Sequence, residues 1–269
     1  MSKYCSWHNE RTIKNYLIFL MHNYNLWFIS DENLRHHTLD TVLKYSFTTD
    51  LETFNKNLID PIKLTFDSKI YNIPIKQTIQ NEISRQQDKT NTNLIWYFHQ
   101  NIFKYIWNGW EVPKRWFDIV NYSRKVFVEM KNKHNTMNSS SSQKTYINMQ
   151  SKILEDNRNC CLLVEVIAKK SQNIPWKNTI NWIQQYNESI RRVSIDRFYE
   201  LVTGESDAFM RLCSVLPIVL DDVVSTIDER QRINSVIEEL KIYSEDILKS
   251  LYLFSFDDYL GFDNFSFQQ

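Results

Sequence analysis

Two acidic residues and a lysine lie close together near the middle of the chain. Asp118 belongs to a short apolar run at 116–120, and Glu129 belongs to a second run at 126–130, which Lys131 follows directly. A short polar segment separates the two runs, a pattern that predicts a β-hairpin. Because side chains alternate along a strand, Glu129 and Lys131 share one face, and strand pairing brings Asp118 to it. Two carboxylates and a lysine beside a sheet favour a divalent-metal site that hydrolyses phosphodiesters.

The Glu-x-Lys pattern is weak by itself, because the chain contains a second copy. Glu239-Leu240-Lys241 lies in a segment, 228–251, that we predict to be one long amphipathic helix, where such charges form a solvated face. The copy at 129–131 differs because it lies in a predicted strand, follows an acid-bearing strand and precedes a polar loop. A charged edge strand is the alternative interpretation of this copy.

Composition limits the class of protein. The chain has 269 residues, 42% of them hydrophobic, and its 32 basic and 32 acidic residues balance to zero, which argues against a histone-like DNA-coating protein. Its four cysteines form neither a zinc spacing nor a disulfide framework. We find no signal peptide and no apolar run of the ~20 residues that a membrane span needs. We therefore expect a cytoplasmic protein without a membrane segment.

Hydrophobic periodicity predicts an α/β chain. We expect one domain over 28–269, preceded by a peripheral extension over 1–27. The helices predicted before the hairpin, the first with Ser30 as N-cap, are 31–45, 50–60, 75–87 and 92–107, with 63–66 extended. After the hairpin we expect strands at 160–168 and 190–195, and helices at 143–156, 196–202, 206–216, 217–226 and 228–251. The four serines at 139–142 indicate either a flexible linker or a binding loop before a helix.

Longer stretches of the sequence resemble a known enzyme family. Pro113 and Asp118, followed by Glu129-Met130-Lys131, look like the PD-(D/E)XK nuclease motif, although Pro113 and Asp118 are not adjacent. The segments that carry the resemblance are NTNLIWYFHQNIFKYIWNGWEVPKRWFDIVN, VFVEMKNKHNTMNSSSSQKTY, LLVEVIAKKSQNIPW and RRVSIDRFYELVTGESDAFMRLCSVLP. They resemble type II restriction endonucleases that cut GGNCC-type sites, and the likeness covers roughly residues 28 to 265.

The resemblance implies a fold and a mechanism. The fold is a PD-(D/E)XK restriction-endonuclease-like core, a mixed β-sheet flanked by helices, with additional N- and C-terminal helices. Asp118, Glu129 and the backbone carbonyl of Met130 would hold Mg²⁺ at the scissile phosphate, and Lys131 would orient the attacking water. In-line attack would leave 5′-phosphate and 3′-hydroxyl ends. Glu82 is a further candidate metal ligand, with an ordinary exposed helix glutamate as the alternative.

A polar stretch directly after the catalytic strand supplies candidate contacts to DNA bases. Its members are Asn132, Lys133, His134, Asn135, Asn138, Ser139, Ser140, Gln143 and Lys144. Loop solvation is the alternative for them, and His134 could also act as a base, a role that Lys131 makes unnecessary. Candidate phosphate contacts, with plain surface as their alternative, are Lys169, Lys170, Arg191 and Arg192. A palindromic DNA target favours a homodimer paired with a cognate DNA methyltransferase.

Some tryptophans depart from the pattern of the family. Trp96, Trp107, Trp116 and Trp182 stand where the resemblance leads us to expect glycine or another small residue. A UGA codon read as tryptophan is one explanation. Trp116 lies beside the predicted catalytic strand, so a DNA-binding relative with impaired catalysis is one alternative to a restriction enzyme. A repair or recombination nuclease of the same fold is the other.

Overall fold

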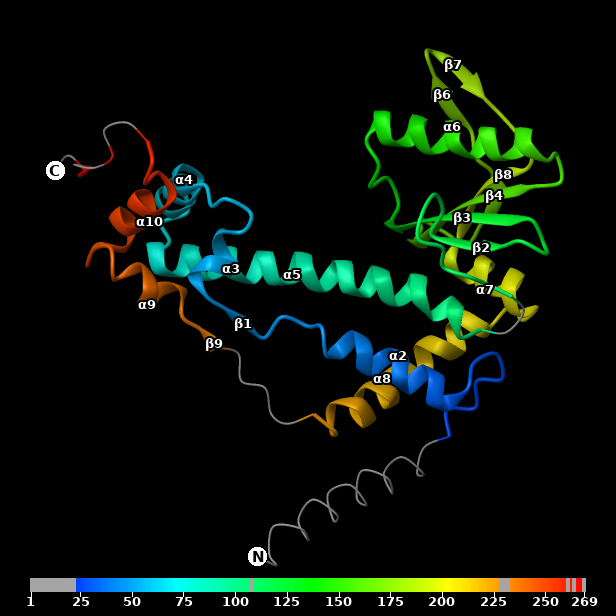
Figure 1. Ribbon diagram of the computed structural model, residues 1–269, viewed down its shortest axis with the longest axis horizontal. Coiled ribbons are helices and arrows are strands. Elements are labelled where there is room, and N and C mark those ends of the chain that lie inside the picture. The colour runs from blue at the N-terminus through cyan, green and yellow to red at the C-terminus, as the bar shows by residue number, and fades with distance from the viewer. Residues whose placement is uncertain (1–22, 107–108, 228–232, 260–261, 263–264, 268–269) are drawn as a thin grey trace, which may run out of the picture. The chain divides into compact units, whose positions relative to one another are not determined.

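The chain folds into two compact units in the computed structural model, which describes residues 23–106, 109–227, 233–259, 262 and 265–267 (Figure 1). The sheet unit comprises Met1–Leu43 and Ile95–Ile227, and the helical unit comprises Lys44–Leu94 and Asp228–Gln269. The sequence predicts a single domain over 28–269, whereas the contacts group these residues into two units, each built from two separate segments.

A five-stranded mixed sheet forms the centre of the sheet unit, in the order β2-β3-β4-β8-β5. Its strands are β2 (Ile119–Asn121), β3 (Val126–Lys133), β4 (Cys160–Ile167), β8 (Ile190–Ser194) and β5 (Asn173–Pro175). The three central strands β3, β4 and β8 run parallel, and β2 and β5 pair antiparallel at the edges. The predicted α/β fold class and the strands at 160–168 and 190–195 are therefore confirmed, as is the predicted hairpin, formed by β2 and β3.

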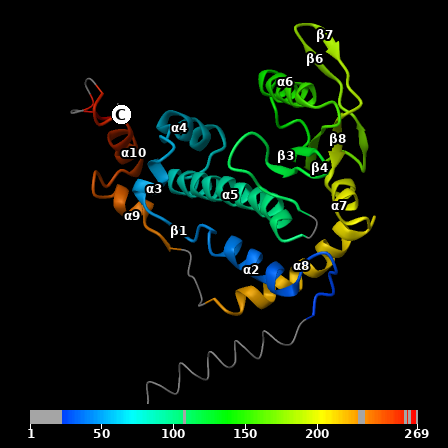
Figure 2. The same cartoon turned by 45° about the vertical axis from the view of Figure 1, so that its right-hand side comes forward.

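Helices cover both faces of this sheet because its buried strands are apolar on both sides. Phe127, Cys161 and Leu163 pack beneath α6 (Ser139–Glu155). The alternate residues Val128, Met130, Leu162 and Val164 join a larger core on the opposite face. The helices of that core are α2 (Asp31–Val42), α7 (Ile195–Thr203) and α8 (Ala208–Val224), and Figure 2 shows α6 and α7 on opposite sides of the sheet. A short hairpin, β6 (Asn178–Ile180) with β7 (Ile183–Gln185), lies beside α6.

The serine run is helical, so its prediction as a linker or loop is wrong. Asn138 is the N-cap of α6, and its side-chain oxygen accepts a hydrogen bond from Ser141 N at 2.8 Å. The four serines thus form the first turn of the helix, which begins at Ser139 instead of Gln143. Capping by an asparagine offsets the modest helix propensity of serine, because it satisfies an otherwise unpaired backbone N–H.

Two predicted helix breaks are absent because long-range packing overrides local signals. Helix α5 (Ile75–Asn101) is continuous through the polar stretch at 88–91 and is followed by the 3-10 turn η1 (Ile102–Lys104). Helix α8 likewise continues through Pro217, where we predicted a break between two helices. The division between the two units falls within α5, after Leu94.

The helical unit has its own apolar core. Its elements are β1 (Thr48–Thr49), α3 (Leu51–Asn55), α4 (Pro61–Ile70), the first part of α5, β9 (Ile233–Asn234), α9 (Val236–Leu240) and α10 (Ile247–Ser255). The prediction that 63–66 is extended is wrong, because Asp60 caps α4 and Pro61 occupies its first turn. The predicted single helix over 228–251 is also wrong over its described part, where α9 and α10 are separate short helices.

The start of the described chain belongs to the core of the sheet unit. Tyr24 and Leu26 are each 6% exposed, and the Tyr24 hydroxyl donates a hydrogen bond to Asp222 Oδ2 at 2.6 Å. The prediction of a peripheral extension over 1–27 therefore does not hold for these two residues, and its first 22 residues lie outside the described part. Among the residues that the structure describes, no helix combines the length and apolar character that a membrane crossing requires.

Candidate active site

Asp118 is fixed to the neighbouring strand by both its backbone and its side chain. It lies one residue before β2, and its N–H donates to Val128 O at 2.9 Å. Its Oδ2 accepts the N–H of Met130 at 2.7 Å, and Gln100 Nε2, from α5, donates to its carbonyl oxygen at 3.1 Å. These contacts hold the carboxylate beside the backbone of β3 without using a charged partner.

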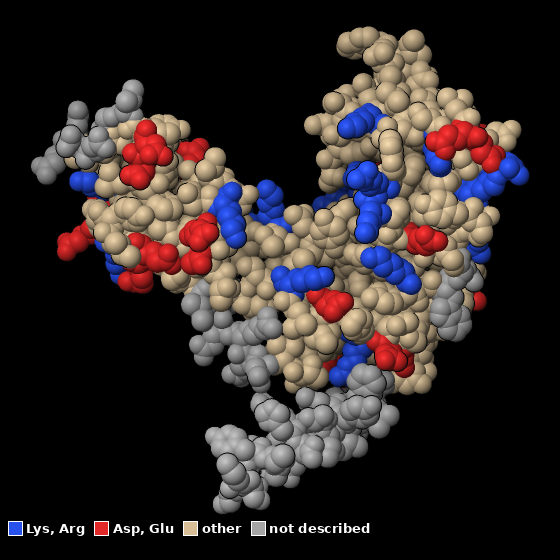
Figure 3. All heavy atoms as spheres, in the orientation of Figure 1, with Lys and Arg blue, Asp and Glu red and all other residues tan. Residues whose placement is uncertain are grey.

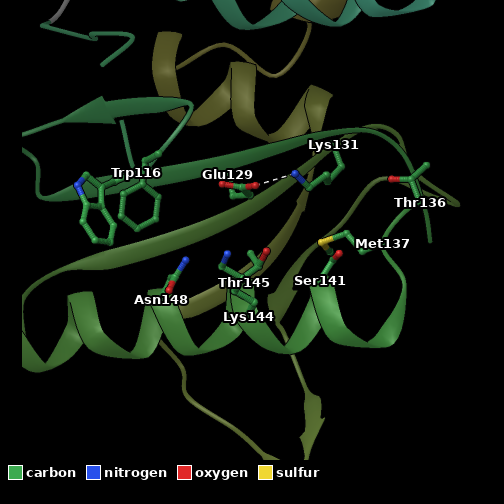
Figure 4. A pocket seen from close by; sticks show the side chains of 10 residues that line it. Trp116, Glu129, Lys131, Thr136, Met137, Ser141, Lys144, Thr145 and Asn148 are labelled. Atoms are coloured by element: carbon green, nitrogen blue, oxygen red, sulfur yellow. Dashed lines mark hydrogen bonds and ion pairs between the residues drawn. The ribbon is translucent and has the colours of Figure 1, made fainter. Parts of the chain in front are cut away.

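Glu129 and Lys131 lie on the same face of β3, as the strand period of two predicts. Lys131 Nζ donates to Glu129 Oε1 at 2.6 Å, and both side chains line a pocket of about 450 Å³ (Figure 4). Met130, between them, points its side chain to the opposite core and is fully buried. The strand therefore presents the side chains of Glu129 and Lys131 to the pocket, and the buried side chain of Met130 fixes their position.

Burial and a neighbouring carboxylate both act on the ionisation of Asp118. Burial, assisted by the negative charge of Glu129, raises the pKa of Asp118 to about 6. The N–H of Met130 and the Lys131 ammonium act in the opposite direction and lower this pKa. A carboxyl group that resists ionisation beside a second carboxylate is a typical setting for a cation, because a positive charge relieves both the burial and the repulsion.

The oxygen donors near this pocket suit a hard divalent cation. They are the carboxylates of Asp118 and Glu129 and the carbonyl of Met130, whose N–H and C=O point to the Asp118 side of β3. The indole N–H of Trp96 also reaches this carbonyl oxygen, at 3.4 Å. No cluster of three or more His, Cys, Asp or Glu side chains suited to a metal occurs in the described part of the chain. Two carboxylates and a carbonyl nevertheless fit Mg²⁺, which keeps several waters when it binds to proteins.

The opposite wall of the pocket is a polar face of α6, of which the sequence analysis named Lys144 but missed Ser141, Thr145 and Asn148. Ser141, Thr145 and Asn148 are spaced four and three residues apart and line the pocket with Lys144. Figure 4 shows this face opposite Glu129, with Thr136 and Met137 on the loop before the helix. The helical spacing of these residues could have revealed the face, but we predicted that the helix begins after Ser141. Hydroxyl, amide and ammonium groups at this spacing are donors for phosphate oxygens.

Comparison with known proteins identifies the family. The model of the Eco47II restriction endonuclease family matches residues 26–225. The chain belongs to this family. It is 32% identical over 218 residues to the type II restriction enzyme Sau96I of Staphylococcus aureus, covering 77% of this chain and 84% of that enzyme. It is 29% identical over 213 residues to the type II restriction enzyme Eco47II of Escherichia coli, covering 74% of this chain and 88% of that enzyme.

Membership of the Eco47II family makes the chain a type II site-specific deoxyribonuclease that binds double-stranded DNA. On the face of this Eco47II-family enzyme seen in Figure 3, basic and acidic side chains gather in separate small groups, consistent with the zero net charge. Binding of DNA by such a molecule depends on local arrangements of donors rather than on a general positive field.

The residues predicted to contact DNA bases in this Eco47II-family enzyme have different local settings. Lys144 lines the pocket, whereas Asn138 caps α6 and Gln143 Nε2 donates to Thr179 O at 3.1 Å. His134 is half-buried, and its Nδ1 lies 3.0 Å from Glu165 Oε2. Exposed side chains are those of Lys133, Asn135, Ser139 and Ser140, and Asn132 is half-buried. Their roles in reading DNA stay predictions.

The predicted phosphate contacts divide in a similar way. Arg191 donates to Asn173 and to Glu188 O, and Arg192 Nη2 pairs with Glu165 Oε1 at 3.0 Å. Lys169 and Lys170 are exposed. The two arginines are therefore held by groups of the protein, and the two lysines carry solvent-facing charge.

Glu82, the further candidate metal ligand, belongs to the helical unit. Its carboxylate accepts hydrogen bonds from Arg85, at 2.5 and 2.7 Å, and from Gln86 at 3.2 Å. The hydrogen bonds from Arg85 and Gln86 lower the pKa of Glu82 despite its partial burial. Glu82 is thus engaged by its own helix, and its metal role stays a prediction.

Two of the unexpected tryptophans adopt a backbone conformation that suits glycine. Trp116 has φ +80° and is 83% exposed, and Trp182 has φ +68° and is 98% exposed. Trp182 follows Asn181, φ +49°, in the turn between β6 and β7, where an asparagine–glycine pair is the usual sequence. Trp116 lines the pocket, Trp96 lies within α5, and Trp107 is outside the described residues.

Proposed function

We propose that this restriction endonuclease is a metal-dependent nuclease of the PD-(D/E)XK superfamily. It makes double-strand cuts at a short palindromic DNA site of the GGNCC type and leaves 5′-phosphate and 3′-hydroxyl ends. The observation that carries the proposal is the arrangement around β3: Lys131 pairs with Glu129 in the pocket, and Asp118, one residue before β2, accepts the N–H of Met130 between them. The resemblance to GGNCC-cutting enzymes supports the choice of site.

The three oxygen donors share one role in this mechanism. Asp118, Glu129 and the carbonyl of Met130 would hold a divalent cation, Mg²⁺, at the scissile phosphate. When bound, the cation supplies Lewis-acid stabilisation of charge on the phosphate oxygens. The raised pKa of Asp118 means that the free enzyme takes up a proton at this carboxyl near pH 6. Ionised Asp118, the form that can hold the cation, therefore becomes the main form only above about pH 6.

Lys131 acts on the attacking water and on the developing negative charge. Its ammonium is held in the pocket by Glu129 Oε1, 2.6 Å away, so it is already directed at the place where the phosphate enters. As a cation it orients the water through the lone pairs of the oxygen and stabilises the additional charge of the pentacovalent transition state. The polar face of α6, with Ser141, Lys144 and Asn148, binds the phosphate backbone on the other side of the pocket.

Symmetry suggests the assembly. A palindromic duplex presents the same phosphate twice, on antiparallel strands, and one pocket can attack one of them at a time. We therefore include in the proposal a homodimer with two-fold symmetry, in which each subunit cuts one strand. A partner methyltransferase that modifies the same site protects the host DNA.

The test is digestion of plasmid DNA of known sequence by the purified protein, with Mg²⁺ and with Ca²⁺. Discrete fragments with 5′-phosphate ends, mapping to GGNCC-type sites, are the expected result. Discrete fragments from another sequence would retain the enzyme class and overturn the proposed site.

Two further results of the same digestion contradict the proposal. Smears or structure-specific nicks would indicate a repair or recombination nuclease. Binding without cleavage would indicate the catalytically impaired relative, in which Trp96 at Met130 O and Trp116 in the pocket obstruct the site. Lys131→Ala, expected to bind but not to cut, controls for a contaminating nuclease.

A further inference from the structure

A buried carboxylate lies on the strand next to Lys131 and takes no part in the proposed chemistry. Glu165, on the central strand β4, is 1% exposed. It is the register partner of Lys131 on the parallel strand β3. Register partners on parallel strands point to the same side of the sheet, and neighbouring strands are about 4.8 Å apart. Glu165 and Glu129 are therefore both placed where they can attract the ammonium of Lys131.

Two basic groups occupy the carboxylate of Glu165. Arg192 Nη2, from β8, lies 3.0 Å from Oε1, and His134 Nδ1 lies 3.0 Å from Oε2 and 3.1 Å from Oε1. A carboxylate oxygen can only accept, so Nδ1 is the nitrogen of His134 that carries the hydrogen. The backbone N–H of His134 also donates to Ile167 O at 2.9 Å, which ties the start of the β3–α6 loop to β4.

We propose that Arg192 and His134 are positioning residues for Lys131, because they neutralise Glu165 and keep it from drawing the lysine out of the pocket. This inference rests on the proposed role of Lys131. With both basic groups in place, the ammonium of Lys131 pairs with Glu129 inside the pocket. Without them a buried, unpaired carboxylate would need a new cation, and Lys131 is the cationic side chain that strand register places beside it.

The surroundings of Arg192 fit this role better than a direct contact with DNA. Its side chain is 21% exposed, and its Nε is buried with no hydrogen-bond partner among the described residues. The exposed Lys169 and Lys170 present their charges to solvent, whereas the guanidinium of Arg192 is engaged by Glu165. Arg192 leaves one polar atom unsatisfied and directs its charge at Glu165.

The test is a pair of charge-removing substitutions and their combination. Arg192→Gln, Glu165→Gln and the double variant are compared by single-turnover DNA cleavage in Mg²⁺ and by DNA binding in Ca²⁺. Arg192→Gln is expected to lower the cleavage rate at least ~10-fold with the Kd changed less than about twofold, because Lys131 is displaced while DNA contacts stay. Glu165→Gln alone is expected to cut within about threefold of the wild-type rate, since it removes the competing charge.

The double variant decides the matter. If the only duty of Arg192 is to neutralise Glu165, the combination of Arg192→Gln with Glu165→Gln recovers cleavage to within about threefold of wild type. A double variant as slow as Arg192→Gln would overturn the proposal, as would weaker DNA binding by Arg192→Gln, because either result makes Arg192 a DNA contact. A Glu165→Gln variant that no longer cuts would overturn it too, because the carboxylate would then act in catalysis itself.

Two more variants keep the test decisive. Arg192→Lys retains the positive charge and is expected to cut much faster than Arg192→Gln; equal rates would contradict a role based on charge. If Arg192→Gln does not fold, His134→Gln gives the same comparison with a smaller loss, again reversed by Glu165→Gln. Failure of the proposed active site is recognised separately, because Lys131→Ala would then still cut DNA.

Discussion

The two Glu-x-Lys tripeptides of this chain have the same pattern, but their side chains make different contacts in the folded protein. In β3, Glu129 and Lys131 point to one side and pair at 2.6 Å, while Met130 is buried on the other. At the end of α9, Lys241 instead pairs with Glu238, three residues away, at 2.6 Å. Glu239 accepts hydrogen bonds from Ser235 Oγ and from Leu51 N.

The difference follows from the period of each element. Residues two apart share a face in a strand but lie about 200° apart around a helix, where the neighbours are three and four residues away. The strand copy therefore concentrates opposite charges in one pocket, and the helix copy disperses them into local structural contacts. The tripeptide acquires chemical meaning only from the element that contains it.

The largest expected difference between the copies is in catalysis. Lys131→Met is expected to lower the single-turnover cleavage rate by at least ~10²-fold, since it removes a cation from the site of charge development, and Lys241→Met is expected to leave the rate within about twofold. Rates are measured on a plasmid with one target site, with DNA binding in Ca²⁺ as a check that both variants still bind. Equal losses in the two variants would break the comparison.

Asp118, the acid just before β2 and beside the first copy, provides a test through the free energy of unfolding. The pKa of Asp118 is raised to about 6 in the folded protein, above its usual 3.8, so ionised Asp118 destabilises the fold at higher pH. Asp118→Asn removes this cost and is expected to raise the free energy of unfolding at pH 8, without divalent metal, by about 1–3 kcal/mol. The gain is expected to shrink as the pH falls from 6 to 4, because the folded wild type is then protonated.

Denaturant unfolding of both proteins at pH 8 and pH 4.5 measures this gain. A stabilisation that does not depend on pH would show that the carboxyl group is not the cause. The matched change at the second copy, Glu239→Gln, replaces a carboxylate that accepts hydrogen bonds from Ser235 and Leu51, and is expected to give no stabilisation at either pH.

Replacing Trp116 tests whether the surroundings of the first copy limit the cleavage rate. Trp116→Gly and Trp182→Gly each relieve a left-handed backbone conformation and are each expected to stabilise the protein by about 1 kcal/mol. Only Trp116 lines the pocket with Glu129, so only its replacement is expected to increase the cleavage rate. Thermal unfolding and single-turnover kinetics measure the two effects, and a Trp116→Gly variant that is slower than wild type would make this indole part of the working site.

The smallest expected effect concerns the second copy alone. Glu239→Ala removes the acceptor for Leu51 N, 3.3 Å away, which joins α9 to α3, and the acceptor for Ser235 Oγ at the start of α9 itself. The expected loss of stability is about 0.5–1.5 kcal/mol, without a change in the cleavage rate. Denaturant unfolding detects it, and a cleavage defect in a fully folded Glu239→Ala protein would give this copy a function that the comparison denies.

Local pattern was sufficient to predict the part of the site that lies within one hairpin. Alternation and two acids predicted β2, β3 and the shared face of Glu129 and Lys131, because these contacts are local and strand geometry fixes them. The pairing of Glu165 with Arg192 was not predictable, since it joins strands whose order only the folded sheet reveals. Lys144 of the polar α6 face was predicted, but Ser141 was not placed on that face, because an asparagine cap extends the helix over four serines of modest propensity.

The core of the helical unit, finally, depends on the C-terminal segment of the chain, so a truncated protein is expected to be degraded in a cell. The family match ends at residue 225, but Val236, Leu240, Ile247 and Leu251 complete the core over Leu51, Phe54, Ile59, Leu64, Ile79 and Ile83. Each of these four side chains contributes about 1.5–3 kcal/mol when buried. A premature stop codon after residue 227 would remove all four and expose the apolar side of the remaining helices. Such a product would be a substrate for proteases and chaperones rather than a shorter nuclease.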